Sequence, residues 1–110
     1  MTAKIVVELR RLRSGRSKWV ARIFNAAARR SHVVKFGARG YSDYTMHGSE
    51  ARKSSYLKRH RARETWTLNG GGLYTAGFWS RWILWNKPTV RQSARDLQKR
   101  YTKLKIIVIE

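Results

Sequence analysis

The chain has 110 residues, of which 25 are Lys or Arg and only 6 are Asp or Glu, so its formal net charge is +19. Cysteine is absent, and 42% of the residues are hydrophobic. This length suits a single domain with one modest core, and the hydrophobic share argues against disorder. The lack of cysteine excludes disulfides, thiolate zinc sites and cysteine nucleophiles.

The charge indicates the class of partner. A compact body this cationic repels itself unless an anionic partner neutralises it, and nucleic acid is the polyanion we favour. A solvated surface and an anionic membrane are the alternatives. No apolar run approaches the roughly 20 residues that cross a bilayer, the N-terminus lacks signal-peptide features, and no segment resembles an interfacial helix. We therefore expect an intracellular domain with no membrane partner.

The N-terminal third predicts a small antiparallel sheet. Residues 4–12 are rich in β-branched side chains. Along residues 18–26 the side chains nearly alternate between two faces, and Trp19, Ala21 and Ile23 fall on one of them. A short Gly-containing loop between the two predicts a β-hairpin, and 31–37 adds a third strand. Since both sheet faces carry apolar residues, we expect later elements to cover at least one of them.

A basic helix is predicted over residues 50–64, with Ser49 as its N-cap. Its apolar side is thin, so it should rest lightly on the body and present its cations outward. The predicted phosphate contacts on this helix are Arg52, Lys53, Lys58, Arg59, Arg61 and Arg63. The alternative is a solvated helix surface with His60 and Glu64 as a local pair.

The C-terminal half predicts a helical hairpin and a last strand. Thr75 caps a helix through Trp85 that is apolar over most of its circumference, so its tryptophans should be core rather than base-stacking residues. Asn86-Lys87-Pro88 ends it, and Thr89 with Gln92 has capping-box spacing for a further helix. On that helix Val90, Ala94, Leu97 and Tyr101 have the spacing of a core stripe. Arg91, Arg95 and Lys99 should face solvent. Residues 103–110 are a β-branched run suited to an edge or closing strand.

These elements predict an α+β fold in one domain, 1–110, with a small antiparallel sheet of three to four strands packed against a Trp-rich region of about three helices. Its parts are a β-hairpin or meander (1–37), a basic helix (49–64), a helical hairpin (75–102) and a C-terminal strand (103–110). The helical hairpin also resembles a helix-turn-helix, in which Arg91, Gln92 and Arg95 would enter the major groove. The Trp-rich first helix favours a structural hairpin instead.

Aromatic and acidic residues suggest two further roles. Tyr41, Tyr44 and Trp66 lie in or beside loops and are the candidates for stacking on bases, although they could equally pack over the core. A metal-dependent nuclease would need carboxylates or histidines to converge. The nearby candidates are Asp43, His47, Glu50, His60 and Glu64, but they show no metal-binding spacing, so we expect no catalytic site, metal or cofactor.

Residues 36–101 carry an extended set of motifs: FGARGYSDYT, then RK..Y..RH..RE.W, TAGFWSRWILWNKPT and S..DL.KRY. This set resembles a family of small basic proteins of unknown function encoded by nucleocytoplasmic large DNA viruses (giant viruses). The resemblance implies a viral protein in the host cytoplasm or nucleus, and a genome that must be packaged. The function expected is therefore a non-enzymatic protein that binds double-stranded DNA without sequence specificity and organises the viral genome. A virion structural protein with acidic partners is the alternative, and a nuclease the third.

Overall fold

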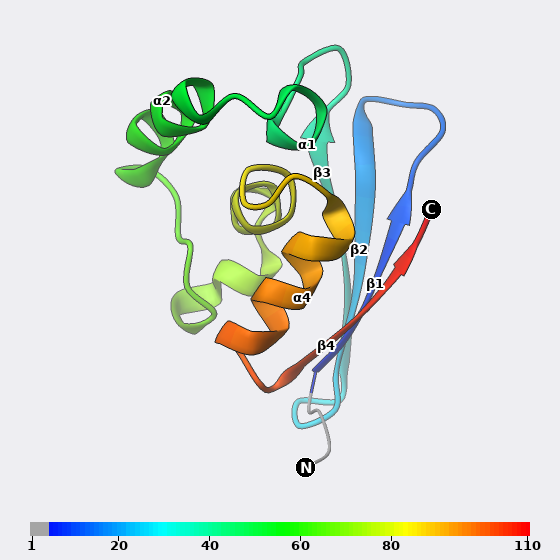
Figure 1. Ribbon diagram of the computed structural model, residues 1–110. Helices are drawn as coiled ribbons and strands as arrows, with labels where there is room; N and C mark the ends of the chain where they lie inside the picture. Colours follow the sequence, from blue (N-terminus) through cyan, green and yellow to red (C-terminus); the bar gives the residue numbers. More distant parts are fainter. Residues whose placement is uncertain (1–4) are drawn as a thin grey trace.

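The computed structural model describes residues 5–110 and shows an α+β fold with a four-stranded sheet on one side and the helices on the other (Figure 1). The strands are β1 (Ile5–Arg11), β2 (Ser17–Asn25), β3 (Arg30–Ala38) and β4 (Leu104–Ile109), in the order β3-β2-β1-β4. The predicted antiparallel meander of the first three strands is confirmed. Residue 4, where the first strand was predicted to begin, lies outside the described residues.

The C-terminal strand β4 pairs in parallel with β1, so the sheet is mixed rather than wholly antiparallel. The helix before β4 ends beside the start of β1, where the Ile5 amide donates to the Lys103 carbonyl at 3.0 Å. Because β4 starts beside the first residue of β1, it runs along β1 in the same direction. The local sequence predicts the strand, but its direction depends on where the preceding helix finishes.

The helical elements are α1 (Tyr44–His47), α2 (Glu50–Arg61), the 3₁₀ turn η1 (Asn69–Tyr74), α3 (Ala76–Trp79), the π turn η2 (Ser80–Leu84) and α4 (Val90–Arg100). The predicted caps form: the side chains of Ser49, Thr75 and Thr89 accept from backbone amides in the first turns of α2, α3 and α4. The short helix α1, capped by Asp43, was not predicted. Helix α2 ends at Arg61, three residues earlier than predicted, where the chain tightens into an i→i−3 bond from the Arg63 amide to the His60 carbonyl.

The core lies between the inner sheet face and the segment α3–η2–α4. Trp19, Ala21 and Ile23 are buried on the inner face, as predicted from their alternation. Trp79 and Trp82 are buried with Phe78 against them, which confirms that these tryptophans are core residues. The whole helical layer lies on this one face, so the opposite face of the sheet is left uncovered (Figure 1).

Two neighbouring glycines in η1 differ in how closely the chain approaches them. A Cβ at Gly72 would stand 2.0 Å from the Thr67 carbonyl oxygen, whereas Gly71 faces open space but has a φ of +85°. We expect Gly72→Ala to lower the free energy of unfolding by about 3 kcal/mol, since backbone must move. Gly71→Ala should cost about 1–2 kcal/mol, for the left-handed backbone alone. Urea denaturation of the two variants measures this difference, and equal costs would contradict it.

Candidate nucleic-acid interface

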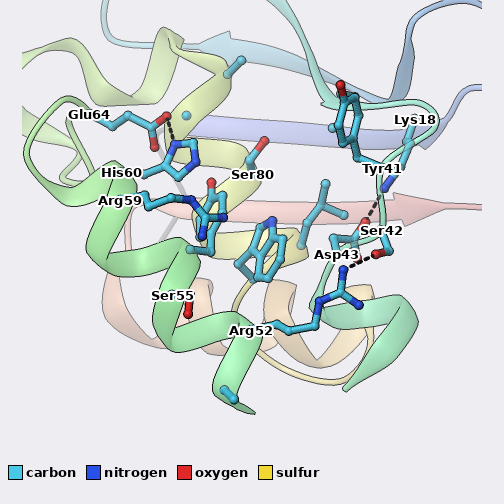
Figure 2. A pocket seen from close by; sticks show the side chains of 18 residues that line it. Lys18, Tyr41, Ser42, Asp43, Arg52, Ser55, Arg59, His60, Glu64 and Ser80 are labelled. Carbon is cyan, nitrogen blue, oxygen red and sulfur yellow. Dashed lines mark hydrogen bonds and ion pairs between the residues drawn. The ribbon is translucent and has the colours of Figure 1, made fainter. Parts of the chain in front are cut away.

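A cleft of about 880 Å³ separates helix α2 from the body of the protein (Figure 2). One wall is α2, and the other is formed by the β3–α1 loop and by the start of the α3–η2 segment. Between these walls the cleft is lined by small and apolar residues, which are Gly37, Gly77, Leu84 and Trp85. Volumes of this size are typical of pockets that hold small ligands or a short stretch of a polymer.

Three contacts hold α2 in place over this cleft. The Tyr56 ring stacks on Trp85 with centroids 4.2 Å apart and an interplanar angle of 2°, and it stacks on His60 on the same helix. Burial raises the pKa of the Tyr56 hydroxyl well above its usual value. The Lys53 ammonium donates to the Asn86 carbonyl oxygen at 2.7 Å, and the Glu50 carboxylate accepts from the Tyr44 hydroxyl. The helix is therefore positioned by its own side chains, although its apolar side is thin.

These contacts correct two of the predicted site residues. Lys53 was predicted to face outward, but it is partly buried, and its ammonium lies 4.8 Å from the centroid of the Tyr44 ring. Desolvation by this burial lowers the pKa of Lys53. Tyr44 was predicted as a stacking residue in a loop, but it is only 7% exposed and belongs to helix α1. Both residues join α2 to the body, so neither is free to contact a ligand.

Arg52 and Arg59 are seven residues apart on α2 and both line the cleft, with Ser55 between them on the same face (Figure 2). The Arg52 guanidinium donates to the Ser42 hydroxyl at 3.0 Å across the cleft. Within residues 5–110, Arg59 makes no ion pair and no hydrogen bond through its side chain. Two guanidinium groups thus point into the cleft without a carboxylate partner.

The cleft also contains two carboxylates, and both are already engaged. Asp43 is buried, accepts from the Lys18 ammonium at 2.7 Å and caps α1 through the Thr45 amide. Glu64 contacts the His60 ring nitrogen at 2.9 Å and accepts from the Trp66 indole N–H, also at 2.9 Å. Lys18, Arg52 and Arg59 line the cleft against these two carboxylates, so the cleft is cationic on balance and suits an anionic ligand.

Of the residues considered for a nuclease, Asp43, His60 and Glu64 line this cleft, whereas His47 and Glu50 do not. Asp43, Glu50 and Glu64 are each bound to a different partner, and the His47 ring accepts from the Ser49 amide at 2.9 Å. Across the described part of the chain, no group of three or more His, Asp or Glu side chains is placed to hold a metal ion.

The remaining stacking candidates differ in their exposure. Tyr41 is 73% exposed at the rim of the cleft, close to Ser42, so its ring is free to stack. Trp66 is half-buried, and the Arg81 guanidinium lies 5.5 Å from its ring centroid. Arg81 also covers Trp82 and donates to the Trp85 carbonyl oxygen, and burial lowers its pKa. Tyr41 is therefore the aromatic residue that the cleft offers to a ligand.

The other predicted cations fall into two groups. Lys58, Arg61 and Arg63 are exposed on the outer side of α2 and just beyond its end, next to the cleft wall. Arg91, Arg95 and Lys99 are exposed on α4, apart from α2 in the fold (Figure 1). Arg91 pairs with Glu110 at 3.1 Å, and Gln92 is hydrogen-bonded to Thr89 in the cap of α4. The structure thus places two predicted cations, Arg52 and Arg59, in the lining of the cleft, three more on α2 and just beyond its end outside that lining, and the α4 group elsewhere.

Sequence reasoning missed the hydroxyl groups of the cleft, which Ser42, Ser55 and Ser80 provide. The position of Ser55, three residues after Arg52 on a predicted helix, was the one available signal. Arg39 was also missed. Its guanidinium donates to carbonyl oxygens of the β1–β2 loop, including Leu12 and Gly15 at 2.8 Å each. Such bonds depend on two loops meeting in space, which no local pattern shows.

Comparison with known proteins finds a similar family, whose function is unknown. Residues 7–60 match a family described as "Family of unknown function (DUF5754)". This match covers just under half of the chain and runs from β1 into the last turn of α2, so it includes Arg52, Arg59 and Tyr41. The chain is therefore similar to this family over the sheet hairpins and one wall of the cleft. No curated protein and no solved structure matches the chain. No helix among residues 5–110 is long and apolar enough to span a membrane.

Proposed function

We propose that this protein binds nucleic acid, chiefly double-stranded DNA, through the sugar-phosphate backbone and without reading base sequence. The observation that carries the proposal is the pair Arg52 and Arg59, which face a cleft with no carboxylate partner of their own. A guanidinium group can bind a phosphate by two parallel hydrogen bonds, which a point charge such as an ammonium cannot do.

The surroundings of the cleft favour a polymer over a small anion. Lys58, Arg61 and Arg63 continue the cationic surface from the cleft wall along α2 and beyond its end. Hydroxyl groups such as Ser42 and Ser80 can donate to phosphate oxygens, as they commonly do in protein–DNA contacts. A chain of phosphates would engage these groups one after another. The binding is non-enzymatic in this proposal, and its biological role is to neutralise and organise the genome of a large DNA virus.

A salt titration tests the proposal. If about six to ten phosphates are contacted, the affinity for a fluorescently labelled duplex should fall about 10³–10⁵-fold between 50 and 200 mM salt. Fluorescence anisotropy measures this, with polyglutamate as the competing polyanion. DNA binding that polyglutamate displaces poorly supports the proposal. Absent or salt-insensitive DNA binding would overturn it, and a preference for polyglutamate would point to acidic protein partners.

A further inference from the structure

The uncovered face of the sheet carries cations and apolar side chains in a regular arrangement. Strand register places its residues in three rows across the sheet. The rows are Lys35–Val20–Arg10–Ile109, Val33–Arg22–Glu8–Ile107 and Ser31–Phe24–Val6–Lys105. We call this surface the open sheet face. Successive rows are about 7 Å apart, two residues along a strand.

The charges of the open sheet face are largely uncompensated. The three rows contain four cations and one carboxylate, Glu8. Glu8 pairs with Arg10 at 3.2 Å. Within residues 5–110, the side chains of Arg22, Lys35 and Lys105 form no ion pair, and all three are exposed. The surface therefore attracts an anion. A second copy of the chain would bring the same three cations against their equals, which like-charge repulsion disfavours.

Apolar groups are exposed on the same surface. Phe24 is 48% exposed, Val33 63% and Ile107 44%. Within the middle row the cation Arg22 lies directly beside Val33, so the apolar groups cannot enter a lipid bilayer without taking a charge with them. A double helix offers phosphates to this surface but keeps its base faces stacked inside. An unpaired strand offers both phosphates and bare base faces, which match the cations and the apolar groups together.

We infer that the open sheet face is a second nucleic-acid site, separate from the cleft, and that it binds single-stranded nucleic acid. One base stacks on Phe24 of β2. Flanking phosphates contact Arg22 on the same strand and Lys105 on β4, which β1 separates from β2. The helical layer lies between this surface and α2, so the two sites face in opposite directions (Figure 1). The inference goes beyond the proposed function, which concerns duplex DNA at the cleft.

The test compares a labelled oligo-dT of about 12 nucleotides, within the usual site size for one domain, with a labelled duplex. Phe24→Ala should weaken oligo-dT binding roughly 5- to 150-fold, as loss of one base stack does, and leave duplex binding unchanged. The matched control is Tyr74→Ala, an exposed aromatic in η1 that belongs neither to the cleft nor to the open sheet face. It should not weaken oligo-dT binding. Phe24→Leu keeps an apolar strand residue and should act like Phe24→Ala, should the alanine variant fail to fold.

A charge variant gives an independent readout. Arg22→Gln with Lys105→Gln should reduce the salt slope for oligo-dT by about 1.4, the value for two single-strand phosphates. Arg95→Gln with Lys99→Gln on α4 removes equal charge and should not reduce it. The inference would be overturned if the two double variants reduced the salt slope for oligo-dT equally, or if the wild type did not bind oligo-dT. Either result could occur with duplex binding intact, so it would not overturn the proposed function. Binding to phosphatidylserine vesicles that requires Phe24, without oligo-dT binding, would overturn it in favour of a membrane surface.

Discussion

Arg52→Gln combined with Arg59→Gln is expected to weaken duplex binding at least about a hundredfold, since each charge-assisted hydrogen bond contributes about 1.5–3 kcal/mol. The same change should reduce the salt slope of binding by about 1.8, because each phosphate contact on B-DNA contributes about 0.9. Both guanidinium groups lie on the cleft side of α2, and neither pairs with a carboxylate among the described residues. Their removal therefore takes away ligand contacts more than contacts within the fold. Anisotropy titrations at several salt concentrations measure both quantities.

The control for this variant lies on α4, where Arg95→Gln with Lys99→Gln removes the same charge from an exposed surface. This control should weaken duplex binding only slightly, through the change in net charge. Lys53→Gln offers a second comparison, because Lys53 is bonded to the Asn86 carbonyl oxygen. We expect it to lower stability rather than to change the salt slope. Similar losses from the α2 and α4 variants would mean that the charge acts diffusely and that the cleft has no special role.

Trp79→Ala is expected to lower the free energy of unfolding by about 3–5 kcal/mol, a large share of the 5–15 kcal/mol that holds a domain folded. The Trp79 side chain is fully buried between Phe36 and Phe78, and its indole N–H donates to the Leu73 carbonyl oxygen at 2.8 Å. The substitution leaves a cavity in the core and removes the hydrogen-bond donor of a buried carbonyl. Circular dichroism with urea denaturation measures the loss.

Two further tryptophan variants separate the causes. Trp79→Phe keeps most of the ring but loses the donor to Leu73, so it should cost about 1–3 kcal/mol. Trp66→Ala should cost less than Trp79→Ala, because Trp66 is only half-buried at the edge of the helical layer. If Trp66→Ala were as destabilising as Trp79→Ala, the core would not be centred on the α3–η2 segment.

The elements could be predicted wherever a local pattern reports burial directly. Alternation placed Trp19 and Ile23 on the inner face of β2, and helical spacing placed Val90, Ala94 and Leu97 on the buried face of α4. The caps at Ser49, Thr75 and Thr89 also form, because a cap needs only a side-chain oxygen within reach of the next turn. Local physics was sufficient for these features.

The candidate site was predicted less completely, since it depends on which elements meet. Arg52 and Arg59 were predicted as outward cations, but their convergence on a cleft follows from the stacking of Tyr56 on Trp85, 29 residues away along the chain. Lys53 shares the same helix and the same charge, yet it turns inward because the Asn86 carbonyl lies beside it. Helical spacing puts Arg52 and Arg59 on one face of α2 and Lys53 on another. Which face meets the cleft is decided by partners in another segment, so the spacing alone does not show it.

By itself, the sequence determined the charge of +19, the α+β fold class and the positions of most helices and strands, because composition and periodicity act within a few residues. The tertiary structure decided the parallel pairing of β4, the cleft under α2 and the uncovered side of the sheet. These features arise from contacts between distant segments, whose geometry depends on how the buried aromatic residues pack. The net charge predicts an anionic partner, but only the fold divides that charge between a cleft and an open sheet face.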